Sequence, residues 1–145
     1  MKNAMRMLAP VLLAFIFVIP GTPFLNAQIT NTIQAHINHS FVIGNTTLPP
    51  GEYTFRMLQG TDLQAMTATS ENDKTSVSFD VETAIDDHTP RHSELIFRRY
   101  GNTEFLSKIF ESGSKDGAEG TETSRDEKHF AQQGLQPIEH TEEQK

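Results

Sequence analysis

The densest group of residues that could do chemistry is Asp86, Asp87, His88 and His92. Carboxylate oxygens and imidazole nitrogens together can hold a divalent metal ion. Pro90 stands between the two histidines and prevents them from sharing one face of a regular helix. The spacing therefore favours a solvated acidic loop, and we assign no metal ligand from it.

His36 and His39 form the second candidate pair. They stand three residues apart in a segment whose apolar residues alternate, which is typical of a β-strand. An odd offset along a strand points two side chains to opposite faces. We therefore expect one solvent-facing histidine, one packed at a strand end, and no metal ion shared between them.

Motifs for covalent or phosphate chemistry are missing from the sequence. It contains no Gly-x-Ser-x-Gly turn for a serine nucleophile and no glycine-rich phosphate loop. The chain has no cysteine, which excludes a thiol nucleophile, a cysteine-containing zinc site and any disulfide. We therefore assign no catalytic residue and no cofactor, and we favour a non-enzymatic protein.

The first 27 residues have the three-part layout of a signal peptide. Lys2 and Arg6 precede an apolar run over 7–19, and prolines and a glycine break this run before Ala27. The layout predicts cleavage after Ala27 and export to the periplasm or the extracellular space. A retained membrane anchor is the alternative, but this run is shorter than the ~20 residues that span a bilayer.

Cleavage would leave an acidic chain of 118 residues. The whole chain has 12 basic and 19 acidic residues, and the predicted signal holds two of the basic ones, so the mature net charge is −9. A chain of this charge without a basic cluster is poorly suited to nucleic acid or to anionic membrane surfaces. We expect no nucleic-acid partner and no stable membrane insertion after cleavage.

Residues 28–111 have the pattern of an antiparallel β domain. Short alternating runs are separated by turn residues, and Gly101-Asn102 between two β-prone runs is a strong hairpin signal. The spacing predicts an all-β fold with a short C-terminal helix, a small antiparallel barrel-like meander or sandwich of six or seven strands. The runs lie within 33–43, 53–57, 63–69, 77–81, 95–100 and 105–110.

Residues 112–145 change in composition and predict a flexible acidic tail. The stretch 112–123 holds three glycines and little apolar surface, as a mobile linker does. Ser124 and Glu127 match a capping box, which predicts a short helix near 124–133 that docks through Phe130 or frays. We expect 135–145 to be disordered.

Two blocks of the sequence resemble those of an uncharacterised family of small exported bacterial β-rich proteins. Residues 39–53, HSFVIGNTTLPPGEY, are similar to its F-x-V-G-x-x-x-L-P-A-G-x-Y opening, and residues 95–107, LIFRRYGNTEFLS, to its L-V-F-H-R-Y-G-x-x-Y-F-L-S block. The resemblance implies export and a compact β domain but no activity. This chain has Arg98 where the family commonly has His, and Glu104 where it commonly has an aromatic residue.

These observations favour a non-enzymatic binding or structural protein of the cell envelope or extracellular space. Its partner would be an envelope or extracellular protein or a small ligand, and the sequence leaves the oligomeric state open. One alternative is a carrier of a small apolar ligand inside the β domain. A less favoured alternative is a divalent-metal-binding protein that uses Asp86, Asp87, His88 and His92.

Overall fold

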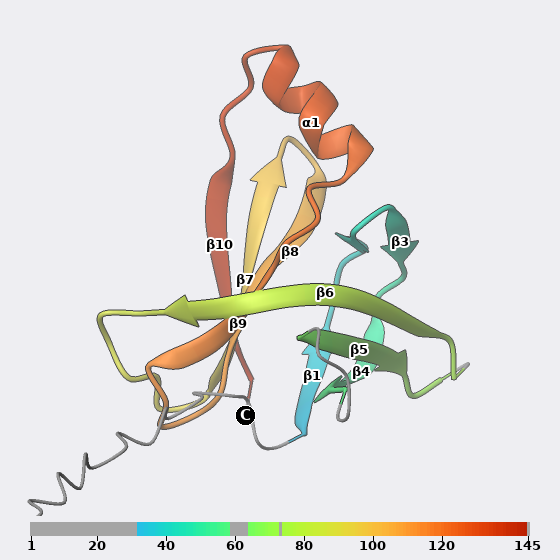
Figure 1. Cartoon of the computed structure of the whole chain (residues 1–145). Coiled ribbons are helices and arrows are strands. Elements are labelled where there is room, and N and C mark those ends of the chain that lie inside the picture. The colour runs from blue at the N-terminus through green and yellow to red at the C-terminus, as the bar shows by residue number, and fades with distance from the viewer. Residues whose placement is uncertain (1–31, 59–63, 73, 145) are drawn as a thin grey trace, which may run out of the picture.

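The computed structural model describes residues 32–58, 64–72 and 74–144, which form one open β-sheet with a short helix (Figure 1). The predicted signal peptide over 1–27 lies outside these residues. In the described ranges no helix is both long and apolar enough to cross a membrane. The elements are β1 (Ile33–Ile37), β2 (Phe41–Ile43), β3 (Thr46–Leu48), β4 (Gly51–Met57), β5 (Ala65–Ser70), β6 (Ser76–Ile85), β7 (Ser93–Tyr100), β8 (Thr103–Phe110), β9 (Asp116–Gly120), α1 (Arg125–Gln132) and β10 (Ile138–Gln144).

The sheet follows the order β1-β4-β5-β6-β9-β8 and then branches. On one branch β8 pairs with β7, and β7 pairs with β10. On the other branch the start of β8 pairs in parallel with β2, and β2 pairs with β3. The other pairings are antiparallel. The all-β class is confirmed. The predicted six or seven strands are too few, because the described part of the chain has ten and they do not close into a barrel.

The strand β6 belongs to both halves of the sheet, the half with β5 and the half with β9. The first half of the long β6 pairs with β5, from Ser76 to Asp80, and its second half pairs with β9, from Val81 to Ile85. β6 runs across the front of the molecule in Figure 1. It therefore joins β1, β4 and β5 to the rest of the sheet.

The core is built from alternating apolar residues, as the sequence predicts. Ile33, Ala35 and Ile37 of β1 are buried while the residues between them are exposed. They pack with fully buried aromatic rings, which meet edge to face or tilted: Phe41, Tyr53, Phe55 and Phe97. Burying an aromatic or aliphatic side chain of this kind contributes roughly 1.5–3 kcal/mol to folding, so this core holds the sheet without disulfides.

The predicted alternating run 33–43 is interrupted at its middle. β1 ends at Ile37, the chain bends at His39, and β2 begins at Phe41 with β3 and β8 as its new partners. This bend is the first of the features that position the candidate site.

Residues 112–145 differ from the flexible tail that composition predicts. β9 lies between β6 and β8, and β10 pairs along the whole of Ser93–Arg99. Glycine has a structural role in β9, since a Cβ on Gly117 would lie 2.5 Å from the carbonyl oxygen of Ile109 and from the ring of Phe110. One of the glycines that indicate a linker in the sequence, Gly117, instead allows a close approach of two strands.

The predicted helix is confirmed, with one change to its cap. Ser124 is the N-cap and its Oγ accepts a hydrogen bond from the Glu127 backbone N–H at 2.9 Å. The Glu127 carboxylate does not complete the capping box. It forms an ion pair with Nε of Arg98 on β7 at 2.7 Å, while Phe130 stacks on Tyr100 with ring centroids 5.6 Å apart.

Candidate metal centre

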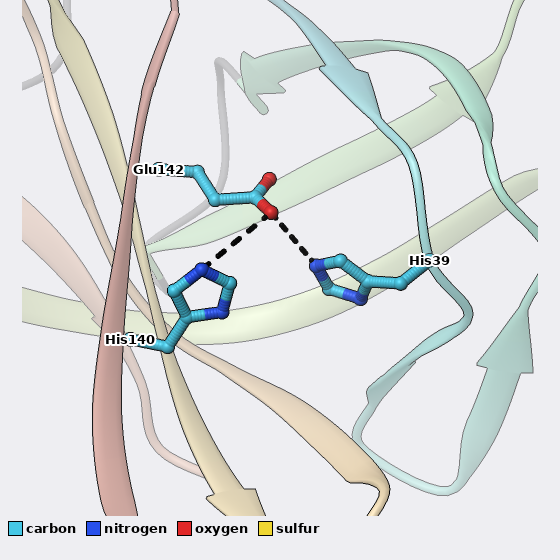
Figure 2. Close-up of side chains that lie close together, drawn as sticks. All are labelled: His39, His140 and Glu142. Carbon is cyan, nitrogen blue, oxygen red and sulfur yellow. Dashed lines mark hydrogen bonds and ion pairs between the residues drawn. The ribbon is translucent and has the colours of Figure 1, made fainter.

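Three side chains with metal-ligating atoms converge beside the end of the sheet: His39, His140 and Glu142 (Figure 2). The Oε1 atom of Glu142 lies 2.9 Å from Nε2 of His39 and 3.9 Å from Nε2 of His140. One ligand atom from each residue lies within 4.8 Å of the others. Within the ranges that the structure describes, no other group of three such residues meets this criterion.

Two elements far apart in the sequence position these side chains. His39 stands at the bend between β1 and β2, and His140 and Glu142 stand two residues apart on β10. Side chains two residues apart on a strand point to the same face. The pairing of His140 with Phe97 and of Glu142 with Leu95 on β7 fixes their position along the sheet.

A buried aromatic ring forms the floor of the site. Phe97 is fully buried, and its ring meets the His39 ring edge to face with centroids 5.1 Å apart. The His140 ring lies 6.2 Å from the same Phe97 ring and 5.8 Å from the His39 ring. An apolar floor restricts how the imidazoles can turn and limits the access of water to them.

The Nδ1 atom of each imidazole faces an acceptor outside the cluster. Nδ1 of His39 lies 3.2 Å from the backbone carbonyl oxygen of Ser40, and Nδ1 of His140 lies 3.4 Å from Oε1 of Glu104. A carbonyl or carboxylate on one ring nitrogen is the usual companion of a metal-ligating histidine, because it holds a proton there and directs the other nitrogen to the metal. Both Nε2 atoms here face Glu142.

The two rings differ in their hydrogen bonds. Both nitrogens of His39 lie within hydrogen-bond distance of an oxygen, and a neutral imidazole has one proton for these two acceptors. The contacts of His140 are longer, at 3.4 and 3.9 Å, and its buried Nδ1 has no hydrogen-bond partner among the described residues. A divalent cation between the Nε2 atoms and Glu142 would engage ring nitrogens whose hydrogen bonding within the described residues is incomplete.

Glu104 adds a second negative charge behind His140. Its side chain is only 9% exposed and its Oε2 has no hydrogen-bond partner among the described residues. Nη1 of Arg99 lies 3.7 Å from its Oε1. A buried carboxylate with so little compensation is costly unless positive charge lies close by.

The donor atoms fit a transition metal. Zinc binds imidazole nitrogen and carboxylate oxygen at ~2.0–2.2 Å, so tetrahedral ligands lie about 3.3 Å from one another. The distances from Glu142 Oε1 to the two Nε2 atoms, 2.9 and 3.9 Å, lie on either side of that value. The three ligand atoms, all within 4.8 Å of one another, are therefore close enough to be compared with a zinc site.

The loop with Asp86, Asp87, His88 and His92 is arranged differently. Oδ1 of Asp86 lies 2.6 Å from Nδ1 of His88, and Nε2 of His88 lies 3.4 Å from Glu94. The hydrogen bonds that the His88 ring donates to the carboxylates of Asp86 and Glu94 raise the pKa of His88 above its usual value. His88 thus bridges two carboxylates as an ion pair, and His92 lines a separate surface pocket beside Thr32 and Gln144.

The two N-terminal histidines lie as the strand pattern predicts. His36 is exposed and pairs with Glu52, whereas His39 is partly buried against Phe97. Sequence reasoning missed His140 and Glu142 because they lie in the predicted disordered tail. The signal present there is the spacing His140-x-Glu142-x-Gln144, which puts three polar side chains on one face of a strand.

Comparison of the chain with protein-family models, curated proteins and solved structures found no match.

Proposed function

We propose that this chain is an exported, non-enzymatic β protein that binds a divalent transition-metal ion with His39, His140 and Glu142. The observation that carries the proposal is the convergence of the two Nε2 atoms on the Glu142 carboxylate, at 2.9 and 3.9 Å, in a group whose ligand atoms all lie within 4.8 Å of one another. The expected export of residues 28–145 rests on the signal-peptide layout of 1–27.

The ligand set favours transition metals over magnesium and calcium. Imidazole suits zinc, copper, nickel and iron, whereas magnesium and calcium prefer an all-oxygen shell. Two histidines and one carboxylate leave at least one coordination position for water or for an external ligand. The proposal therefore concerns zinc-like ions, and it includes no chemical step on a substrate.

The alternative of an apolar-ligand carrier has less support. Large side chains are fully buried in the described part of the chain, and the interior of a small β domain is commonly filled by its own side chains. They include Phe41, Phe55, Phe97, Phe110, Tyr53 and Met66.

The test is a calorimetric titration of the untagged protein with Zn²⁺, with Mg²⁺ and Ca²⁺ as comparison ions. We expect about one equivalent of Zn²⁺ to bind and neither comparison ion to compete. At free Zn²⁺ 100 times the dissociation constant, binding should stabilise the fold by about 2.7 kcal/mol. For a domain of this size that corresponds to a rise in Tm of about 10 °C.

The decisive variants exchange one histidine at a time. His140→Gln removes a ligand and should weaken Zn²⁺ binding about 100-fold or more, since even changes behind the ligands cost 10–100-fold. His36→Gln is the matched control, because His36 lies outside the cluster and is exposed. If Zn²⁺ binding survives His140→Gln but is lost in His88→Gln, the metal belongs to the 86–92 loop and the proposal is overturned. Absence of Zn²⁺ binding to the wild type would also overturn it.

A further inference from the structure

We infer that the metal links β10 to the bend between β1 and β2 across the open edge of the sheet. Metal binding would then determine how readily β10 detaches from the sheet. The inference rests on the proposed metal binding. It concerns the edge between β1 and β10, which we call the seam: residues 33–39 on one side and 138–144 on the other.

The seam is crossed by side chains and not by a β ladder. β1 pairs with β4 and β10 pairs with β7, and the two strands face each other at opposite ends of the strand order. The described bonds across the seam are those of Gln144 Oε1 with the His36 backbone N–H, at 2.9 Å, and of Glu142 with His39. A pocket of about 370 Å³, lined in part by Glu52 and Glu143, opens beside it. The seam therefore admits water.

β10 has little apolar burial to hold it on the sheet. None of its seven residues is buried, and Ile138, its one large apolar side chain, is 61% exposed. β7, its partner, buries five of its eight residues. A strand held by backbone bonds without buried apolar contacts belongs to the part of a protein that opens most readily.

The charge on β10 also opposes its docking. The two arginines of β7, the strand that pairs with β10, contact carboxylates outside β10. Arg98 pairs with Glu127, and Arg99 lies next to Glu104. β10 has no lysine or arginine of its own but carries three glutamates, Glu139, Glu142 and Glu143. A dication beside Glu142 and Glu104 would offset this negative charge.

The ligands lie on both sides of the seam. His39 is contributed by the β1–β2 bend, whereas His140 and Glu142 are contributed by β10, about one hundred residues later. A metal bound by all three would cross-link the two chain segments, as a disulfide does in many exported domains. The chain has no cysteine with which to make that link.

The test is hydrogen–deuterium exchange of the purified full-length gene product with and without Zn²⁺, with binding measured in the same buffer. Opening that breaks the site is suppressed by a factor of one plus the ratio of free metal to its dissociation constant. At a ratio of 100, exchange of the amides in 138–144 should slow about 100-fold. In the metal-free protein these amides should exchange faster than those of β4 and β5.

Two variants on β10 separate the possible outcomes. Glu142→Gln removes a ligand, and its β10 exchange should no longer respond to Zn²⁺. Glu143→Gln makes the same change of charge on the exposed face, and it should keep the response. Zn²⁺ that binds to the wild type without slowing β10 exchange would overturn the inference and leave the proposed function intact, whereas absence of binding would overturn both.

Discussion

Nε2 of His39 lies 2.9 Å from Oε1 of Glu142, although 103 positions separate the two residues in the chain. The bend at 38–40 positions the first atom, and the pairing of β10 with β7 positions the second. The candidate metal centre is thus a product of the tertiary fold, and the predictions below test the parts that build it.

Replacing Glu104 with Gln should lower the affinity for Zn²⁺ without lowering the stability of the metal-free protein. The change removes the carboxylate that faces Nδ1 of His140, so Zn²⁺ affinity should fall about 10–100-fold. It also removes a buried negative charge with an unpartnered oxygen, so the metal-free protein should be no less stable than the wild type. Calorimetric titration and urea unfolding measure the two effects. Parallel loss of stability and affinity would contradict the role of Glu104 as a group that supports His140.

Gly117→Ala should destabilise the protein by about 1–3 kcal/mol, because the new Cβ would overlap the backbone of Ile109 and the ring of Phe110. Gly120→Ala is the matched control on the same strand, where the nearest atom to a new Cβ is 4.0 Å away. Urea unfolding monitored by circular dichroism measures both. Equal effects of the two changes would show that β9 is not packed as described.

Ser124→Ala should cost about 1 kcal/mol of folding free energy, because the Glu127 backbone N–H loses its acceptor at the start of α1. Thr123→Ala, one residue earlier and exposed, should change stability by less than about 0.5 kcal/mol. Thermal unfolding compares the two variants. A cost for Thr123→Ala as large as that for Ser124→Ala would argue against Ser124 as the cap.

The pKa of His88 should lie above the usual histidine value. Hydrogen bonds with Asp86 and Glu94 raise its pKa, so its contribution to stability is fully present below the unfolded pKa of about 6.5. That contribution is lost as the pH rises through the raised pKa of the folded state. NMR titration of the His88 ring measures the midpoint.

Asp86→Asn should lower the His88 midpoint, since Asp86 is the largest cause of the upward shift. Asp87→Asn is the neighbouring control and should leave the midpoint in place. A midpoint unchanged by Asp86→Asn would contradict the bond between Asp86 and His88.

Local patterns predicted the parts of the fold that depend on neighbours in the sequence. Alternation identified the buried face of β1, Gly101-Asn102 identified the turn between β7 and β8, and Ser124 marked the start of α1. In each case the signal is a short-range preference for one backbone conformation or one exposed face.

The missed parts depend on contacts between distant segments. The glycines of β9 indicate a linker until Gly117 is seen against Ile109. β10 alternates, but with His140 and Glu142 on its inner face where strand patterns are expected to be apolar. Its pairing with β7 overrides a composition typical of disorder, and the candidate site lies on that strand.

The division of β6 between two sets of partners has a consequence for unfolding. The β5 ladder uses Ser76 to Asp80 and the β9 ladder uses Val81 to Ile85, so one continuous strand belongs to both ladders. Loss of either ladder leaves half of β6 unpaired and so weakens the order of the strand on which the other ladder depends. The two halves of the sheet should therefore unfold in one cooperative transition, with calorimetric and van't Hoff enthalpies that agree.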